Sequence, residues 1–256
     1  MIASLGMYDF GPLVGANDRL WTGIRDRLRD RGIAAPDRLV RGEGAYWQAW
    51  EAADLVLSQT CGLPFRTRLQ GQVGYVGTPD YGVEGCPPGY YRSVFVARSD
   101  DPRQTLAAFD GARFAYNEAM SQSGWAAPQN HAATLGIHLP PTLQTGGHRL
   151  SAQAVAEGRA DIAALDAVTF ALLQTDEPAM ARLKELARTE PTPGLPFITA
   201  RDTDPQPIFA AVADAIAALD PADRATLHLK GFVRIPIASY LAVPNPPAPD
   251  QIAQAI

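Results

Sequence analysis

The chain has 256 residues, of which 46% are hydrophobic and 19% are charged, and its formal net charge is -5. This length allows one large domain or two lobes that each bury a core, and no apolar run approaches the ~20 residues that a membrane-spanning helix needs. The interspersed, slightly acidic charge offers no basic surface to a nucleic-acid backbone. We therefore expect a soluble protein that does not bind nucleic acid.

The first ten residues, M-I-A-S-L-G-M-Y-D-F, lack the basic segment, the long apolar segment and the small-residue cleavage site of a secretory signal. Taken as written, the chain is not expected to be exported, and a leader removed before this start is also compatible with the sequence. Cys61 and Cys86 do not have a metal-binding spacing, so a disulfide and two thiols are both open. We expect neither a metal nor another cofactor.

The first third of the chain alternates strand and helix patterns. A short apolar run at 2–7 predicts a buried strand, and the spacing of Leu20, Ile24 and Leu28 predicts a helix over 17–31. The pattern then predicts a strand at 38–41, a helix at 46–53 and a strand at 54–57. This order is typical of a parallel sheet covered by helices, which binds ligands in loops at the carboxyl ends of its strands, here 8–12 and 58–64.

A second α/β unit is predicted to begin after Val96. Two β-rich segments precede it, at 72–79 and 90–98, and the later one leaves the first lobe. The new unit is predicted to contain helices at 101–109, 124–135, 148–160 and 168–173 and strands at 113–117 and 161–166. Residues 187–196 then carry the chain back, ahead of helices at 206–219 and 221–229. We therefore assign 1–94 to the first lobe, 95–195 to an inserted second lobe, and 196–256 to a return to the first lobe that ends in a Pro-rich tail.

A compact polar turn, S-Q-S-G at 121–124, joins the predicted strand at 113–117 to a helix that starts near Trp125. The first amides of a helix have no internal partner and favour an anion. The hydroxyls of Ser121 and Ser123 add donors there, and Gly124 permits close approach. The simpler interpretation is that Ser123 caps the helix and Ser121 shapes a turn, and the local pattern alone favours it.

Three stretches change that balance: S-Q-S-G-W at 121–125, L-V-L-S-Q-T-C-G-L-P at 55–64, and T-G-G-H-R-L-S-A-Q-A-V-A-E-G-R-A-D-I-A-A-L-D at 145–166. Their order and spacing resemble the substrate-binding proteins of phosphate, phosphite and phosphonate ABC importers, over a region from Leu5 to about Pro236. The resemblance implies an α/β, two-lobed type II periplasmic-binding-protein fold with a mainly parallel sheet in each lobe and two hinge strands. It also implies that the S-x-S-G turn holds the oxygens of a small phosphorus oxyanion.

The resemblance extends to single residues of the second lobe. G-G-H at 146–148 matches the family's G-x-H, which implies that His148 donates to the anion, whereas the residues alone leave a helix-capping or exposed histidine open. Asp166 and Glu190 match positions where a carboxylate accepts a hydrogen bond from P–OH or from a substrate amine. Glu190 is equally well explained as an exposed loop carboxylate, and we interpret His131 as structural.

The first lobe is expected to contribute Tyr8 from the loop after its first strand, and Ser58, Gln59 and Thr60 from the loop after its third. The Q-T-C-G-L-P segment departs from the phosphonate-binding pattern, which leaves the identity of the ligand open. The predicted ligand-binding set is Tyr8, Gln59, Thr60, Asn117, Ser121, Gln122, Ser123, Gly124, His148, Asp166 and Glu190.

The sequence thus predicts a non-catalytic, monomeric solute-binding protein that captures a small phosphorus oxyanion in an interlobe cleft, with ABC permease subunits as partners. Two alternatives stay open. One is a ligand sensor of the same fold that acts without export. The other is a hydrolase that uses Ser121 or Ser123 with His148 and Asp166, although no G-x-S-x-G motif supports it. The resemblance indicates a periplasmic location, and the missing leader keeps a cytoplasmic one open.

Overall fold

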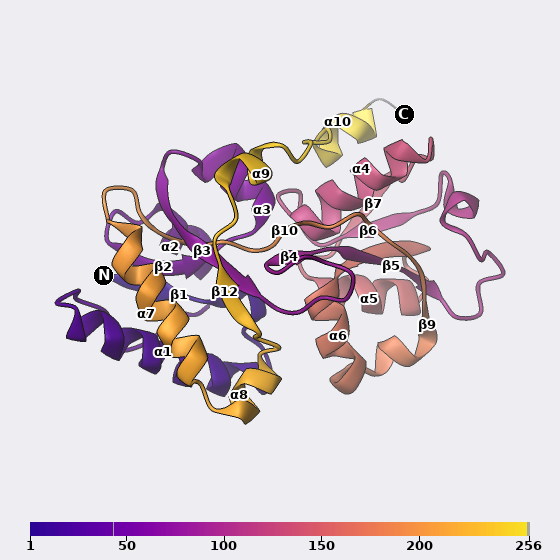
Figure 1. The fold of residues 1–256 in the computed structure, drawn as a ribbon. Coiled ribbons are helices and arrows are strands. Elements are labelled where there is room, and N and C mark those ends of the chain that lie inside the picture. The colour runs from indigo at the N-terminus through magenta and orange to yellow at the C-terminus, as the bar shows by residue number, and fades with distance from the viewer. Residues whose placement is uncertain (43, 255–256) are drawn as a thin grey trace. The chain divides into compact units, whose positions relative to one another are not determined.

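The computed structural model describes residues 1–42 and 44–254, and the chain divides into two compact units (Figure 1). Unit 1 contains Met1–Tyr90 and Pro193–Tyr240, and unit 2 contains Tyr91–Thr192 and the chain from Leu241 onward. The chain therefore passes between the units three times. Strand β4 (Tyr90–Tyr91) pairs with strand β10 (Thr192–Pro193) at the first two passages. Residues 255–256 of the predicted return to the first lobe lie outside the described residues.

The sheet of unit 1 has five strands in the order β1-β2-β11-β3-β12. These are β1 (Ile2–Ser4), β2 (Leu55–Gln59), β11 (Phe197–Ala200), β3 (Val73–Asp80) and β12 (Gly231–Val233). Only β1 and β2 pair in parallel, because the returning strand β11 inserts between β2 and β3 and runs antiparallel to both, and β12 is antiparallel to β3. The predicted mainly parallel sheet is therefore wrong for unit 1, whose sheet is mixed.

Helices α1 (Leu13–Asp30) and α7 (Pro205–Ala218) lie side by side in unit 1, as Figure 1 shows. The residues that predicted α1, Leu20, Ile24 and Leu28, are all buried, so this helix owes its position to one apolar face. The other helices of this unit are α2 (Ala45–Glu51), α3 (Gly62–Pro64) with the π turn η2 (Phe65–Leu69), α8 (Pro221–Thr226) and α9 (Ile237–Leu241), together with the 3-10 turn η1 (Gly6–Tyr8).

The strand predicted at 38–41 is wrong. This segment is irregular, and the hydrogen bond from the Val40 amide to the Ala3 carbonyl, at 2.8 Å, does not extend into a ladder. Two charged residues, Arg38 and Arg41, flank the short apolar pair, and Arg41 pairs with Asp9 and Asp18 instead of entering the sheet. The start of unit 1 is therefore β-α-α-β.

The sheet of unit 2 has the order β7-β6-β8-β5-β9. Its strands are β7 (Pro141–Gln144), β6 (Phe114–Tyr116), β8 (Ile162–Asp166), β5 (Ser93–Arg98) and β9 (Leu183–Arg188). Strand β6 is parallel to β7 and β8, whereas β5 is antiparallel to β8 and β9. This sheet is also mixed, because β5 enters in the opposite direction. Its helices are α4 (Ala127–Thr134), α5 (His148–Ala156), α6 (Ala167–Asp176) and α10 (Pro249–Gln254), with shorter turns η3 (Leu106–Phe109), η4 (Gln122–Ala126) and η5 (Pro178–Arg182).

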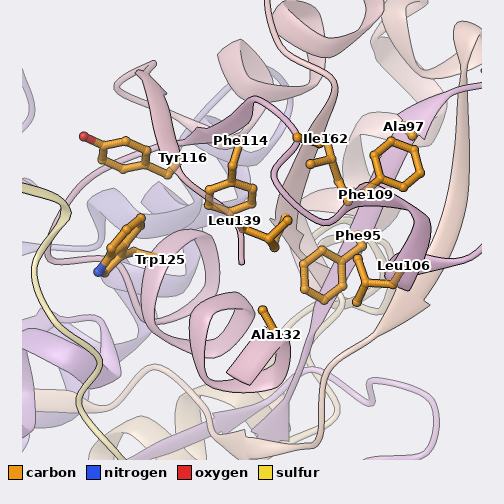
Figure 2. Packing of buried hydrophobic residues seen from close by; sticks show 12 residues of the cluster. Phe95, Ala97, Leu106, Phe109, Phe114, Tyr116, Trp125, Ala132, Leu139 and Ile162 are labelled. Atoms are coloured by element: carbon orange, nitrogen blue, oxygen red, sulfur yellow. The ribbon is translucent and has the colours of Figure 1, made fainter. Parts of the chain in front are cut away.

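The core of unit 2 gathers aromatic rings from several elements (Figure 2). Phe95, Phe109 and Phe114 are fully buried, and the Trp125 ring lies 5.1 Å from that of Tyr116, at the other side of the cluster. Trp125 is therefore a core residue that fixes the helix beginning at Gln122, as its apolar character suggests.

The Pro-rich tail belongs to unit 2, whereas the sequence assigned it to the first lobe. The indole Nε1 of Trp125 donates to the Pro247 carbonyl at 3.2 Å, Asn130 donates to the Pro244 carbonyl at 2.9 Å, and Ile252 packs against the core of this unit. Proline carbonyls are good acceptors even though proline has no amide hydrogen. The tail is thus held by hydrogen bonds from η4 and α4, the helical segments that contain and follow the polar turn.

Candidate ligand-binding site

The polar turn at 121–124 forms the start of the π turn η4, which continues into α4. Ser121, and not Ser123, is the N-cap: its Oγ accepts a hydrogen bond from the Gly124 amide at 2.9 Å. The amides of Trp125 and Ala126 both donate to the Ser121 carbonyl. Within the described chain the Ser123 amide makes no hydrogen bond. One main-chain donor and the hydroxyl hydrogen of Ser121 are therefore left for another group.

Ser123 and His148 meet although 25 residues separate them. The Ser123 Oγ and the His148 Nε2 are 2.9 Å apart, and His148 is the first residue of α5, after the extended Gly147. Burial lowers the pKa of His148 to about 4, and the Ala164 carbonyl acts in the opposite direction. A histidine with this pKa is neutral at pH 7. The sequence predicted that His148 touches the anion, whereas in the structure its Nε2 engages Ser123.

Gly124 is required by its neighbours. A Cβ built on it would lie 1.8 Å from the Asn117 Oδ1 and 3.2 Å from the His148 Cε1. The Oδ1 of Asn117 is itself buried and makes no hydrogen bond among residues 1–42 and 44–254. Asn117 thus lies directly over the turn, so four members of the predicted set, Asn117, Ser123, Gly124 and His148, are close together.

Ser93, the first residue of β5, contacts the turn. The sequence did not predict this residue. Its hydroxyl donates to the Ser123 carbonyl at 2.8 Å, and its register partner in β8 is Asp166. Asp166 is buried, and its Oδ1 accepts from the Thr169 amide at 2.9 Å as the N-cap of α6. A serine at the first position of an apolar strand carries no local signal of this role, because the contact depends on the pairing of β5 with β8.

Two further predicted residues of unit 2, Gln122 and Glu190, differ in their exposure to solvent. Gln122 is buried in the turn. Glu190 is exposed, and its charge acts on His131, raising a pKa that burial lowers. The structure thus associates Glu190 with a histidine other than His148.

The three predicted residues of unit 1 are buried and largely occupied by protein contacts. The Tyr8 ring packs edge-on against Tyr81, with centroids 5.1 Å apart. The Gln59 Nε2 donates to the Tyr81 hydroxyl at 2.9 Å and to the Leu195 carbonyl at 3.4 Å, and the Thr60 hydroxyl approaches the Cys61 carbonyl at 3.5 Å. Each of these side chains therefore has a structural use in unit 1.

The chain matches one family model over residues 52–240, that of the periplasmic substrate-binding protein of the phosphonate ABC transporter. This match covers well over half of the chain. The chain belongs to that family. A search of curated proteins found no match.

Solved structures of substrate-binding proteins share the fold at low sequence identity. PhnD1 from Prochlorococcus marinus, in complex with methylphosphonate, has 15% identity and a TM-score of 0.69, over 99% of this chain and 96% of that one. XAC2383 from Xanthomonas citri, bound to chloride, has 16% identity and a TM-score of 0.68, over 100% and 98%. A phosphonate-transporter binding protein from Pseudomonas aeruginosa, PA3383, has 15% identity and a TM-score of 0.66, over 91% and 80%. The fold is that of type II periplasmic binding proteins, in agreement with the sequence prediction.

As a member of this substrate-binding family, the protein serves ABC import by binding a solute, and the family consists of transporter components and not of enzymes. The family is periplasmic and implies a small-molecule ligand and permease partners. Of the helices that the structure describes, none has the length and apolarity to cross a membrane. Neither Cys61 nor Cys86 forms a disulfide within the described residues.

Proposed function

We propose that this substrate-binding protein captures a small phosphorus oxyanion at the turn of unit 2, using Ser121, Ser123 and Gly124. The observation that carries the proposal is the convergence of the unbonded Ser123 amide with the Ser121 and Ser123 hydroxyls at the start of a helix. The positive end of the helix dipole favours an anion at this place. The family match supports a phosphonate or a close relative as the ligand.

His148 has the role of a positioning residue in this proposal. The neutral imidazole and the Ser123 Oγ share one hydrogen bond, which fixes where this hydroxyl lies; which of the two atoms donates depends on the ring nitrogen that holds the proton. Asn117 packs against Gly124 on the same side as His148. His148 contributes no positive charge to the site, because burial keeps its ring neutral at pH 7.

This arrangement favours a ligand that keeps a proton. The turn offers neutral donors, and its neighbour through Ser93 is the carboxylate of Asp166. A dianion would meet that carboxylate at a cost that neutral donors do not offset, whereas a P–OH group can donate to a carboxylate. We propose Asp166 as the acceptor, and we place Gln122 and Glu190 at the edge of the site with no assigned contact.

Hydrolysis is the competing activity, since a serine hydroxyl and a histidine nitrogen are 2.9 Å apart. A nucleophilic serine needs a base whose other nitrogen is oriented by a third group. Among the described residues no carboxylate orients the His148 ring, on which the Ala164 carbonyl acts instead, and a pKa of about 4 makes a weak base at neutral pH. These features support binding without turnover.

Import and sensing place different demands on the same fold, and the family match supports import. We propose that the protein acts on the periplasmic side as a monomer and delivers its ligand to permease subunits. Co-purification with a permease and ATPase pair encoded beside its gene would support this assignment. Co-purification with a kinase or regulator instead would favour the sensor.

A ligand screen tests the proposal directly. The protein is heated with millimolar methylphosphonate, phosphite, phosphate, sulfate or malate, and the shift of the unfolding temperature is measured. A ligand at 100 times its Kd stabilises the folded state by about 2.7 kcal/mol. We expect the largest shift with methylphosphonate or phosphite and little with sulfate, and no loss of p-nitrophenyl phosphate on long incubation. A shift with malate alone, or release of p-nitrophenol, would contradict the proposal.

A further inference from the structure

The C-terminal tail, residues 244–254, lies close to both ends of the polar turn of unit 2. After the turn, the indole Nε1 of Trp125 donates to the Pro247 carbonyl at 3.2 Å. Before the turn, strand β6 ends at Tyr116, whose pKa is raised by burial and also by the charge of Asp250 in α10. Helix α10 contacts β7, which pairs with β6 (Figure 1). The tail is therefore near the segments that enter and leave the turn.

Two aromatic rings connect the tail to the ligand donors of the turn. The Trp125 ring is 5.1 Å from the Tyr116 ring, and Trp125 is 1% exposed. Asn117 follows Tyr116 in the chain and packs against Gly124. Gly124 in turn joins Ser123 to Trp125. The segments on both sides of Ser123 are thus held through these two rings.

Two further contacts hold the tail on unit 2. Asn130 donates to the Pro244 carbonyl at 2.9 Å, and Ile252 packs against the core. Four of the six residues 244–249 are prolines, whose fixed φ lowers the entropy that the tail loses when it is ordered. The tail is therefore a stiff segment that is anchored on both sides of Pro247.

The tail supplies the acceptor for a buried donor. A buried N–H that loses its acceptor leaves an unsatisfied polar group, which is destabilising. Without the tail, Trp125 would keep an unpaired N–H or turn its ring to reach water. A turned ring would leave its place beside Tyr116, and the turn would lose packing that fixes it.

We propose that the tail is a positioning element of the ligand site, which holds Trp125 and Tyr116 and thereby keeps the turn in the geometry that binds the oxyanion. This rests on the proposed function, and it adds the C-terminus to the parts of the chain on which affinity depends. The tail acts through Trp125 and not through a contact of its own with the ligand. A turn that adopts its binding geometry for only part of the time binds more weakly in proportion to that fraction, so the tail pre-organises the site.

The test compares three variants with the unaltered protein. A chain that ends at Val243 lacks the tail. Ile252→Ser loosens the tail without altering any residue of the turn or of α4, and Trp125→Phe keeps a ring but removes the donor to Pro247. Circular dichroism establishes which variants fold, and the two substitutions carry the test if the shortened chain does not.

Two properties of each variant are measured. Calorimetry gives the affinity for methylphosphonate, and NMR without ligand gives the hydrogen exchange of the Gly124 and Ala126 amides, which are both bonded within the turn. We expect the shortened chain to bind about tenfold more weakly, as it would if the turn kept its binding geometry for about a tenth of the time. Both amides should exchange faster. The two substitutions should change both properties in the same direction and by less.

Leu106→Ala is the control for a loss of stability alone. Leu106 belongs to the same core and lies away from Trp125 in it (Figure 2). This substitution should lower the unfolding temperature and leave both the affinity and the exchange of the turn unchanged.

Two results would overturn the proposal. One is affinity and amide exchange like those of the unaltered protein in the folded tail variants. The other is a loss of affinity in Leu106→Ala as large as theirs, which would make the effect of the tail one of general stability. If the unaltered protein binds no phosphorus oxyanion, the proposed function fails instead, and the exchange measured without ligand still judges whether the tail holds the turn.

Discussion

The turn at 121–124 in unit 2 and the serine pair Ser4 and Ser58 in unit 1 hold their hydroxyl groups in different ways. In the turn, the Ser121 Oγ caps a helix and the Ser123 Oγ engages His148, so both oxygens are positioned by hydrogen bonds before any ligand arrives. In unit 1 the two hydroxyls lie on strands and have no partner among the described residues. The hydroxyls of the turn are thus oriented by their own contacts, whereas those of the serine pair are held only by the pairing of their strands.

This difference has an energetic consequence. Removing a hydroxyl that is bonded inside the protein weakens the fold, whereas removing an unbonded buried hydroxyl costs no hydrogen bond. Variants of the turn are therefore expected to change stability and affinity together, and variants of the serine pair are expected to leave stability level or raise it.

The largest effect is expected from Ser123→Ala/His148→Ala. This change removes a ligand donor and the group that orients it, so binding should weaken by about 3 kcal/mol, the upper end of the range for one hydrogen bond to a charged group. Calorimetry with methylphosphonate measures the loss. Thr134→Ala, at the end of the helix that follows the turn and bonded to the His131 carbonyl, is the control. Affinity like that of the unaltered protein would remove the turn from the site.

The pH dependence of stability is the next effect. The pKa of His148 is about 4 in the folded protein and about 6.5 in the unfolded chain. The unfolded chain therefore binds more protons between these values, so stability falls as the pH drops from 6.5 to 4, by at most about 3 kcal/mol. His148→Gln should abolish this part of the loss in urea titrations at pH 7, 5.5 and 4.5. Parallel curves for the two proteins would contradict a buried, neutral His148.

Gly124→Ala probes the crowding of the turn. The new methyl group would overlap the Asn117 Oδ1, so Asn117 and the helix start must shift, at a cost of about 1–3 kcal/mol in unfolding free energy. Affinity should fall with it. Gly147→Ala is a matched control, since its backbone is extended and no atom lies within 4 Å of its added Cβ. Equal effects of the two substitutions would argue against a tightly packed turn.

The smallest effect concerns the tail. Asn130→Ala removes the hydrogen bond to the Pro244 carbonyl and should cost about 0.5–1 kcal/mol. Hydrogen exchange should then rise in 248–254, while Thr134→Ala on the same helix should leave the tail unchanged. Faster exchange confined to unit 1 would contradict the placement of the tail with unit 2.

Periodicity and turn chemistry predicted much of this molecule, because they depend on neighbouring residues. The apolar spacing of Leu20, Ile24 and Leu28 predicted α1, and the apolar run that ends at Asp166 predicted β8. Strand β9, L-K-E-L-A-R, was missed since it is half-buried and charged. The antiparallel course of β11 was missed because strand direction follows from how the chain returns, which no local pattern contains.

The residues of the candidate site also fall into two groups, those that a local pattern predicted and those that only strand pairing places. The turn at 121–124 and His148 were predicted, and the structure brings them within a hydrogen bond of one another. Ser93 was not predicted, because its position beside Asp166 comes from strand register. Gln59 was predicted from its place after a strand, but the alternation of side chains puts it on the face where Tyr81 holds it.

The amide of Ser123 provides the most direct test of the account. It is the main-chain donor at the helix start that makes no hydrogen bond in the described structure, and its proton resonance can be followed by NMR during a titration with methylphosphonate. The account predicts a large downfield shift of this resonance that saturates with the calorimetric affinity. Saturable binding of methylphosphonate with an unchanged Ser123 resonance would contradict it.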